Sequence, residues 1–150
     1  MPAPPLSLRA RALKALARRE HTRRELQAKL RPFAEDTDEL EPLLDDLEKR
    51  GWLSEARFVE QLTTVRRRRF GAARILHELR EKGVSDTALA AAQSQLKDSE
   101  LDAARAVWKK KFGSLPVTLE ERAKQSRFLA SRGFSAEVIH RLFRGAESSD

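Results

Sequence analysis

Two runs of consecutive cations are the densest candidate chemistry in the sequence. They are Arg66-Arg67-Arg68-Arg69 and Lys109-Lys110-Lys111, and a Phe-Gly pair follows each run. Guanidinium and ammonium groups bind phosphates and carboxylates. The dipole at a helix C-terminus favours a cation by about 0.3–1 kcal/mol, which explains one or two cations but not four in a row. Because successive helical residues turn by about 100°, we expect two of the arginines to reach a partner and another to pair with an acidic residue.

Further cations lie near the start of the chain and at the start of a later expected helix. Arg18, Arg19, Arg23 and Arg24 form a second basic region, and Arg74 stands in a first helical turn. The helix dipole disfavours a cation there, so a specific partner is expected for Arg74. The candidate partner-binding residues are therefore Arg18, Arg19, Arg23, Arg24, Arg66, Arg67, Arg68, Arg69, Arg74, Lys109, Lys110 and Lys111.

Catalytic chemistry finds little support in the sequence. His21, His77 and His140 lie far apart, without the spacing of metal-binding histidines, and no Gly-rich phosphate loop or cysteine is present. We interpret His21 and His140 as helix-end and surface residues. The carboxylates of residues 35–48 are explained by the solvated face of an amphipathic helix. We therefore expect no catalytic residue, no metal site, no cofactor and no enzymatic activity.

Composition indicates a helical protein with an anionic partner. Among 150 residues, Leu and Ala far outnumber Val and Ile, and Tyr is absent, which favours helices over strands. The net charge of +7 arises from 30 Lys and Arg against 23 Asp and Glu. It is unevenly arranged, since residues 1–34 sum to +7 and residues 35–62 to −7. With no signal peptide, no long apolar run and no cysteine, we expect a soluble cytoplasmic protein.

Nine short amphipathic helices are expected, each opened by a capping residue. The first runs from about Ser7 to Glu20 with a predicted apolar stripe of Ala10, Leu13, Leu16 and Ala17. Two capping boxes are predicted, Thr22 with Glu25 and Thr118 with Glu121. Other helices are predicted to begin at Asp38, Ser54, Gly71, Ser85, Ser99 and Ser135. The apolar stripes are predicted to include Phe33 and Val65.

The helices group into similar trios. Gly83-Val84-Ser85 recurs 50 residues later as Gly133-Phe134-Ser135. A module of about 45 residues has a marginal core of its own, so stacking is expected to stabilise it. We predict an all-α, elongated and curved tandem array of three three-helix repeats. The predicted divisions are a flexible leader (1–6), the repeats (7–53, 54–97 and 98–145) and a tail (146–150).

Three landmarks give the chain a resemblance to a known family. They are the segments 51–58 (Gly-Trp-Leu-Ser-Glu-Ala-Arg-Phe), 71–84 and 127–134, and the Lys111-Phe112-Gly113 turn accompanies them. In this order and spacing they resemble the RecX regulatory proteins. The chain departs from the family pattern at Ala72, where proline is frequent, and at Ser54-Glu55, where two acids are frequent. Both substitutes suit a helix start.

The resemblance implies more than the residues alone indicate. It implies binding in the groove of the RecA–single-stranded DNA filament and inhibition of RecA's recombinase, ATPase and coprotease activities, within DNA repair, recombination and the SOS response. It also implies a protein with no enzymatic activity. We further expect a monomer with weak, non-specific affinity for single- or double-stranded DNA and no membrane association.

Two other functions stay open at this point. The first is a DNA-binding helical module acting alone, as an architectural protein or a transcription regulator. The second is an accessory subunit that serves an enzyme as a scaffold. The aromatic residues weigh against a dedicated single-strand binder, because most lie on apolar stripes where bases cannot stack. Trp52 is expected to pack between modules.

Overall fold

The chain folds into an elongated stack of helices. The computed structural model describes residues 4–147, in which the regular structure comprises nine α-helices and two short 3-10 helices, with no strand. The α-helices are α1 (Leu8–Arg18), α2 (Arg23–Leu30), α3 (Leu40–Lys49), α4 (Glu55–Arg66), α5 (Ala72–Glu81), α6 (Asp86–Asp98), α7 (Glu100–Lys111), α8 (Leu119–Ser131) and α9 (Ala136–Glu147). No helix in this part of the chain is long and apolar enough to cross a membrane.

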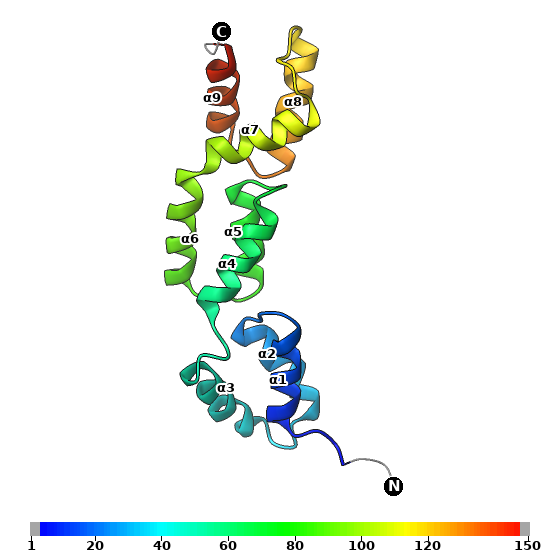
Figure 1. The fold of residues 1–150 in the computed structure, drawn as a ribbon, viewed down its shortest axis with the longest axis vertical. Coiled ribbons are helices and arrows are strands. Elements are labelled where there is room, and N and C mark those ends of the chain that lie inside the picture. The colour runs from blue at the N-terminus through cyan, green and yellow to red at the C-terminus, as the bar shows by residue number, and fades with distance from the viewer. Residues whose placement is uncertain (1–3, 148–150) are drawn as a thin grey trace.

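Three layers follow one another along the stack. Repeat 1 (α1–α3), repeat 2 (α4–α6) and repeat 3 (α7–α9) lie in chain order from the N-terminal to the C-terminal end (Figure 1). The predicted all-α array of three-helix repeats is thereby confirmed. Of the predicted leader and tail, residues 1–3 and 148–150 lie outside the described residues.

Each repeat has its own apolar core. The buried residues are, in repeat 1, Ala12, Ala15, Leu26, Leu30, Leu40, Leu44, Leu47 and Leu53. In repeat 2 they are Phe58, Ile75, Leu79, Val84, Leu89, Ala92 and Leu96. In repeat 3 they are Ala104, Val107, Trp108, Leu129, Phe134, Ile139, Leu142 and Phe143. Since the three clusters are small and separate, the contacts between repeats decide how rigidly the stack holds together.

Capping residues define most helix starts as predicted. The capping boxes Thr22–Glu25 and Thr118–Glu121 are both present. Two predicted caps differ in detail. Asp36, and not Asp38, accepts a backbone N–H, and it caps the 3-10 helix Thr37–Glu39 that leads into α3. Ser99 is the N-cap residue of α7, as predicted, but its side chain makes no capping hydrogen bond, and Ser99 is at the same time the C-cap of α6.

The predicted apolar stripe of α1 is right only in part. Ala12 and Ala15 are buried and Leu16 packs partly buried against the core, whereas Leu13 is 36% exposed. The two alanines let α1 pack closely on its neighbours, an arrangement that a pattern search for large apolar side chains does not favour. Phe33 and Val65 were predicted on buried stripes but are mostly exposed.

Trp52 also departs from its prediction. Its side chain is 43% exposed, and the guanidinium of Arg50 lies 5.3 Å from the ring centroid. The expected packing between modules is therefore wrong. The cation covers the ring locally, in the turn that leads from repeat 1 to repeat 2.

Repeats 1 and 2 meet through polar contacts around the start of α2. The Thr22 hydroxyl donates to the carbonyl of Lys82 at 2.7 Å, and Arg57 Nε lies 2.8 Å from a carboxylate oxygen of Glu20. His21 is 2% exposed, which corrects its interpretation as a surface residue. Its Nδ1 lies 3.0 Å from the carbonyl oxygen of Arg19, while Nε2 has no hydrogen-bond partner.

Repeats 2 and 3 meet backbone to backbone. The amide of Gly71 donates to the carbonyl oxygen of Arg132 at 2.7 Å, and the amide of Ala73 donates to the carbonyl oxygen of Gly133 at 3.3 Å. A Cβ atom on Gly71 would lie 2.5 Å from the carbonyl carbon and oxygen of Gly133. The close approach therefore requires glycine at position 71.

A carboxylate completes this junction. Glu100, in the first turn of α7, accepts hydrogen bonds from the Ala72 amide at 3.1 Å and from Arg67 Nη1 at 3.0 Å. Arg67 also donates to the carbonyl of Leu96 and to Ser99 Oγ. The Arg67 and Glu100 side chains are 15% and 12% exposed, so the pair is largely shielded from water.

We expect Gly71→Ala to destabilise the protein by about 1–3 kcal/mol, because the methyl group collides with rigid backbone. Urea unfolding measures the effect. The matched control is Gly145→Ala, where the added Cβ makes only an ordinary contact at 3.6 Å. Alanine raises helix stability at such a position, so the control is expected to be neutral or slightly stabilising. A Gly71→Ala protein as stable as the parent would contradict the close approach.

Arg67→Ala is expected to lower the free energy of unfolding by roughly 2–3 kcal/mol, because it leaves the shielded Glu100 carboxylate without its cation. Its exposed neighbour Arg68 supplies the control, since Arg68→Ala is expected to stay within about 0.5 kcal/mol of the parent. Chemical denaturation of both variants provides the comparison. Equal stability of the two would show that Arg67 does not hold the junction.

Stability is expected to decrease in mildly acidic solution because of His21. Burial lowers the pKa of His21 below its ordinary value of 6.5. As the pH falls through this value, the unfolded chain binds a proton that the folded chain does not, so the free energy of unfolding decreases. Unfolding measured at about pH 7.5 and about pH 5.5 tests this. In His21→Gln the decrease should disappear; a decrease of the same size would assign it to other groups.

Candidate polyanion-binding surface

A basic hollow lies where repeats 2 and 3 meet. It measures about 250 Å³, and Arg68, Arg69, Lys110, Lys111 and Arg132 line it. Val107 and Phe128 complete the lining, which includes no acidic residue. The two cation runs, about 40 residues apart in the sequence, are thus brought together by the fold. Five cations at one hollow make a site suited to an anion.

The backbone junction explains why these cations converge. The hydrogen bond from the Gly71 amide to the Arg132 carbonyl places the end of α4 beside the turn between α8 and α9. On the other side, the rings of Phe112 and Phe128 meet edge to face at 5.4 Å and bring the end of α7 alongside α8. Phe128 lies among the cations, 5.5 Å from Lys111 Nζ and 4.9 Å from the Arg132 guanidinium carbon.

The four consecutive arginines divide into two inward and two outward residues. Arg66 makes a bidentate pair with Glu78, both contacts at 2.9 Å. The hydrogen bond from Arg66 lowers the pKa of Glu78 below its ordinary value. Arg67 is held by Glu100, as described above. Arg68 and Arg69 are exposed and form no ion pair within the described residues, so these two remain available to a partner.

The lysine run ends on the same surface. Lys109, Lys110 and Lys111 are all exposed, and Lys110 and Lys111 line the hollow while Lys109 does not. None of the three forms an ion pair in the described part of the chain. That they and the outward arginines bind a partner stays a prediction.

The basic region of repeat 1 does not converge on one site. Arg19 pairs with Glu25 at 3.0 Å, and Arg24 packs its side chain against Gly83 of repeat 2. Arg23 bridges α2 to α3 through the carboxylates of Glu41, Asp45 and Glu48, at 2.8, 2.8 and 3.1 Å. Arg18 lies apart from them, at a separate hollow between α1 and α2. Three of these four arginines therefore have contacts within the chain.

Arg74 has partners within the chain as well. Its Nη1 donates to the carbonyl of Ser131 at 3.2 Å, and its guanidinium carbon lies 4.3 Å from the ring centroid of Phe70. These contacts join α5 to the end of α8. Contacts within the chain therefore compensate for the unfavourable interaction of the Arg74 cation with the helix dipole, and no external partner is needed to explain this residue.

Arg132 was missed as a site residue in the sequence. Its guanidinium carbon lies 4.9 Å from the ring of Phe128 and 5.5 Å from that of Phe70, at the wall of the hollow. The available signal was the repeat itself, because Arg132-Gly133 matches Lys82-Gly83 in the 50-residue overlay. Arg132 is a single cation outside the two runs, so a pattern of consecutive cations does not identify it.

Among the side chains that the structure describes, no group of three or more His, Cys, Asp and Glu could hold a metal ion. The five cations of the basic hollow offer electrostatic binding by guanidinium and ammonium groups.

Family models match two of the three repeats. The model of the RecX third three-helix domain matches residues 98–143, and the model of the RecX second three-helix domain matches residues 54–92. Together they cover more than half of the chain.

Relatives and solved structures agree with these matches. Regulatory protein RecX of Ralstonia nicotianae is 49% identical over 148 residues, covering 99% of this chain and 93% of the relative. The protein of the same name from Leptothrix cholodnii is 49% identical over 144 residues, covering 96% and 92%.

The crystal structure of RecX from Lactobacillus salivarius superimposes with a TM-score of 0.80 at 18% identity, over 93% of this chain and 94% of that one. A second crystal structure of a regulatory protein RecX gives a TM-score of 0.75 at 19% identity, over 90% and 70%. These two likenesses concern the fold. The near-complete matches to relatives at 49% identity and the two family models show that the chain belongs to the RecX family of regulatory proteins.

Proposed function

We propose that this protein binds the RecA–single-stranded DNA filament and inhibits RecA's recombinase, ATPase and coprotease activities, as a regulator in DNA repair and recombination. The choice of RecA as the partner rests on the membership of the chain in the RecX family. The observation on this chain that supports the proposal is the basic hollow between repeats 2 and 3, with its five cations and no acidic lining residue. On this proposal the protein acts as a cytoplasmic monomer without enzymatic activity of its own.

Cations held in a fixed arrangement suit a polymeric anion. The basic runs sit at the ends of α4 and α7, which the backbone junction holds beside the turn after α8. Neutralising several phosphates releases their counterions, and this release drives binding to nucleic acid. Acidic groups of the filament protein would be bound by the same cations.

The acidic block of repeat 1 gives the stack a second charge sign. Residues 35–53 hold eight Asp and Glu against two Lys and Arg, a net charge of −6, at mostly exposed positions in α3 and in the segment before it. Alternating patches along the stack would fix its orientation on a repeating surface of complementary charge. A stack that spans neighbouring protomers would stabilise one filament state over those needed for turnover, and inhibition would follow.

Charge reversal of the hollow tests the proposal. We expect Arg68→Glu with Lys110→Glu to raise the protein concentration that half-inhibits RecA's DNA-dependent ATP hydrolysis by an order of magnitude or so. The matched control is Lys49→Glu with Lys124→Glu, which changes the net charge equally at exposed positions outside the hollow. Thermal unfolding of both variants separates lost binding from lost folding. Unchanged inhibition by a folded double variant would overturn the site, and no inhibition by the parent protein would overturn the function.

The same hollow also fits the phosphates of bare DNA, which favours a DNA-binding module acting alone as the second candidate. This alternative predicts tight duplex binding whose log K falls with log salt by about 0.9 per neutralised phosphate. Titrations of bare duplex and of RecA filament at physiological salt distinguish the two. Binding that persists on the filament and is weak on bare duplex supports the regulator; the reverse supports the DNA-binding module.

A further inference from the structure

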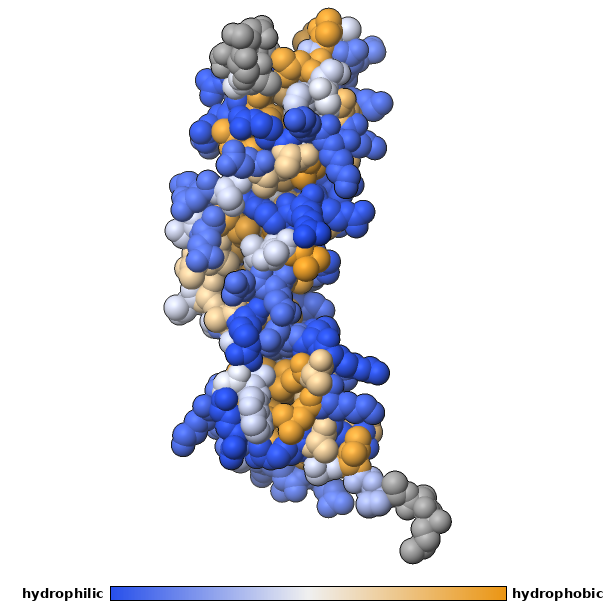
Figure 2. All heavy atoms as spheres, viewed as in Figure 1, coloured by the Kyte–Doolittle hydropathy of each residue, from blue (hydrophilic) through white to orange (hydrophobic). Residues whose placement is uncertain are grey.

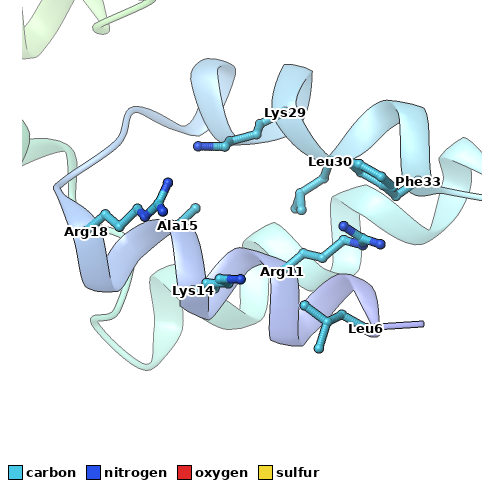
Figure 3. Close-up of a pocket in the computed structure, with 8 residues that line it drawn as sticks. All are labelled: Leu6, Arg11, Lys14, Ala15, Arg18, Lys29, Leu30 and Phe33. Carbon is cyan, nitrogen blue, oxygen red and sulfur yellow. The ribbon is translucent and has the colours of Figure 1, made fainter. Parts of the chain in front are cut away.

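A second hollow lies on repeat 1, at the far end of the molecule from the basic hollow. It measures about 240 Å³ and lies between α1 and the α2–Phe33 segment (Figure 3). Its apolar lining consists of Leu6, Ala15, Leu30 and Phe33. Leu30 is buried in the core, whereas Leu6 is 48% and Phe33 53% exposed. Figure 2 shows apolar atoms gathered on this repeat, over α1 and α2, between hydrophilic ones.

Every charged residue at this hollow is a cation. Arg11, Lys14, Arg18 and Lys29 complete the lining, and no acidic residue belongs to it. Figure 3 shows these side chains around the apolar ones, from both α1 and α2. Within the described residues, Lys14, Arg18 and Lys29 form no ion pair, and Arg11 stacks on Phe33 at 3.6 Å from the ring centroid.

Other arginines of the same repeat are paired. Arg9 contacts Asp46 at 2.8 Å, Arg19 contacts Glu25, and Arg23 contacts three carboxylates of α3. Repeat 1 therefore has many acidic groups near its cations, yet those at the hollow are left without one. Unpaired cations collected around an apolar depression are complementary to a ligand that is acidic at its rim and apolar at its centre.

The shape of the hollow favours a peptide over a nucleic acid base or a membrane. The Arg11 guanidinium covers a face of Phe33, the only aromatic ring in the lining, so that face is closed to a stacking base. A membrane binds apolar groups that protrude into it. Here the apolar groups form a depression, which receives a side chain.

We propose that this hollow is a docking site for an acidic protein segment that inserts one bulky apolar side chain between α1 and α2. Carboxylates on either side of that side chain pair with Lys14, Arg18 and Lys29. The proposal does not rest on the proposed function, because the hollow shares no residue with the basic hollow between repeats 2 and 3.

Peptide binding to the full chain tests the proposal. The probe is a fluorescent peptide of Asp and Glu residues with a central Phe, and its partner probe has Ala in place of Phe. By anisotropy at low salt, we expect Lys14→Glu with Lys29→Glu to weaken binding of the Phe peptide roughly tenfold. The control pair Lys49→Glu with Lys124→Glu makes the same change in net charge and is expected to bind as the parent does.

The apolar part of the proposal has its own readout. Phe33→Ala is expected to weaken binding of the Phe peptide several-fold and to leave binding of the Ala peptide unchanged, since Phe33 is largely exposed and its loss leaves the core intact. Equal affinity for the two peptides, or equal weakening by both charge-reversed pairs, would overturn the docking site. Variants of the hollow that lose binding to a single-stranded oligonucleotide or to anionic vesicles, but keep binding to the peptide, would also overturn it. So would a parent protein that is a dimer and becomes a monomer on substitution of Lys14 and Lys29.

Discussion

The close approach of Gly71 to the backbone of Arg132 and Gly133 is the contact on which the rest of the arrangement depends. Each repeat buries a small core, so the relative position of repeats rests on junctions of this kind. Here the junction joins the start of α5 to the turn after α8, and Glu100 ties the start of α7 to both α5 and Arg67. As a result the end of α4 and the end of α7 share one surface, and their outward cations line one hollow.

The net charge of +7 is best understood as what remains after the fold has paired its own charges. Arg66 and Arg67 are bound by Glu78 and Glu100, and Arg23 links α2 to α3. These cations hold helices and repeats together. Among the cations without a carboxylate partner in the described residues, five line the hollow between repeats 2 and 3 and four line the hollow on repeat 1. A uniformly basic coat would bind any polyanion, whereas two separate patches along the stack favour a particular spacing and orientation of the partner.

Local features of the fold could be predicted from the sequence, and long-range ones could not. Thr22 and Thr118 predict helix starts because capping depends on residues only three positions away, and both capping boxes are present. Helical geometry predicts that four consecutive arginines do not share one face, but α4 ends at Arg66 and the other three lie in the following turn. Which of them point inward, and to which partners, has no local signal in the sequence. Arg67 meets Glu100 across 33 residues and Thr22 meets Lys82 across 60. Burial of His21 and the role of Arg132 arise from such contacts between repeats, which leave no local pattern. The stripe of α1 was predicted only in part because two alanines, Ala12 and Ala15, are its most buried residues, whereas Leu13 is exposed.

The central claim is that the surface at the junction of repeats 2 and 3 faces the RecA filament. Amide hydrogen exchange of the full protein, free and bound to RecA on single-stranded DNA, tests it most directly. The account predicts slower exchange on binding at residues 66–70, at 109–112 and at 131–134, which lie around the basic hollow. Bound protein whose protection falls elsewhere, with these three segments exchanging as in the free protein, would contradict it.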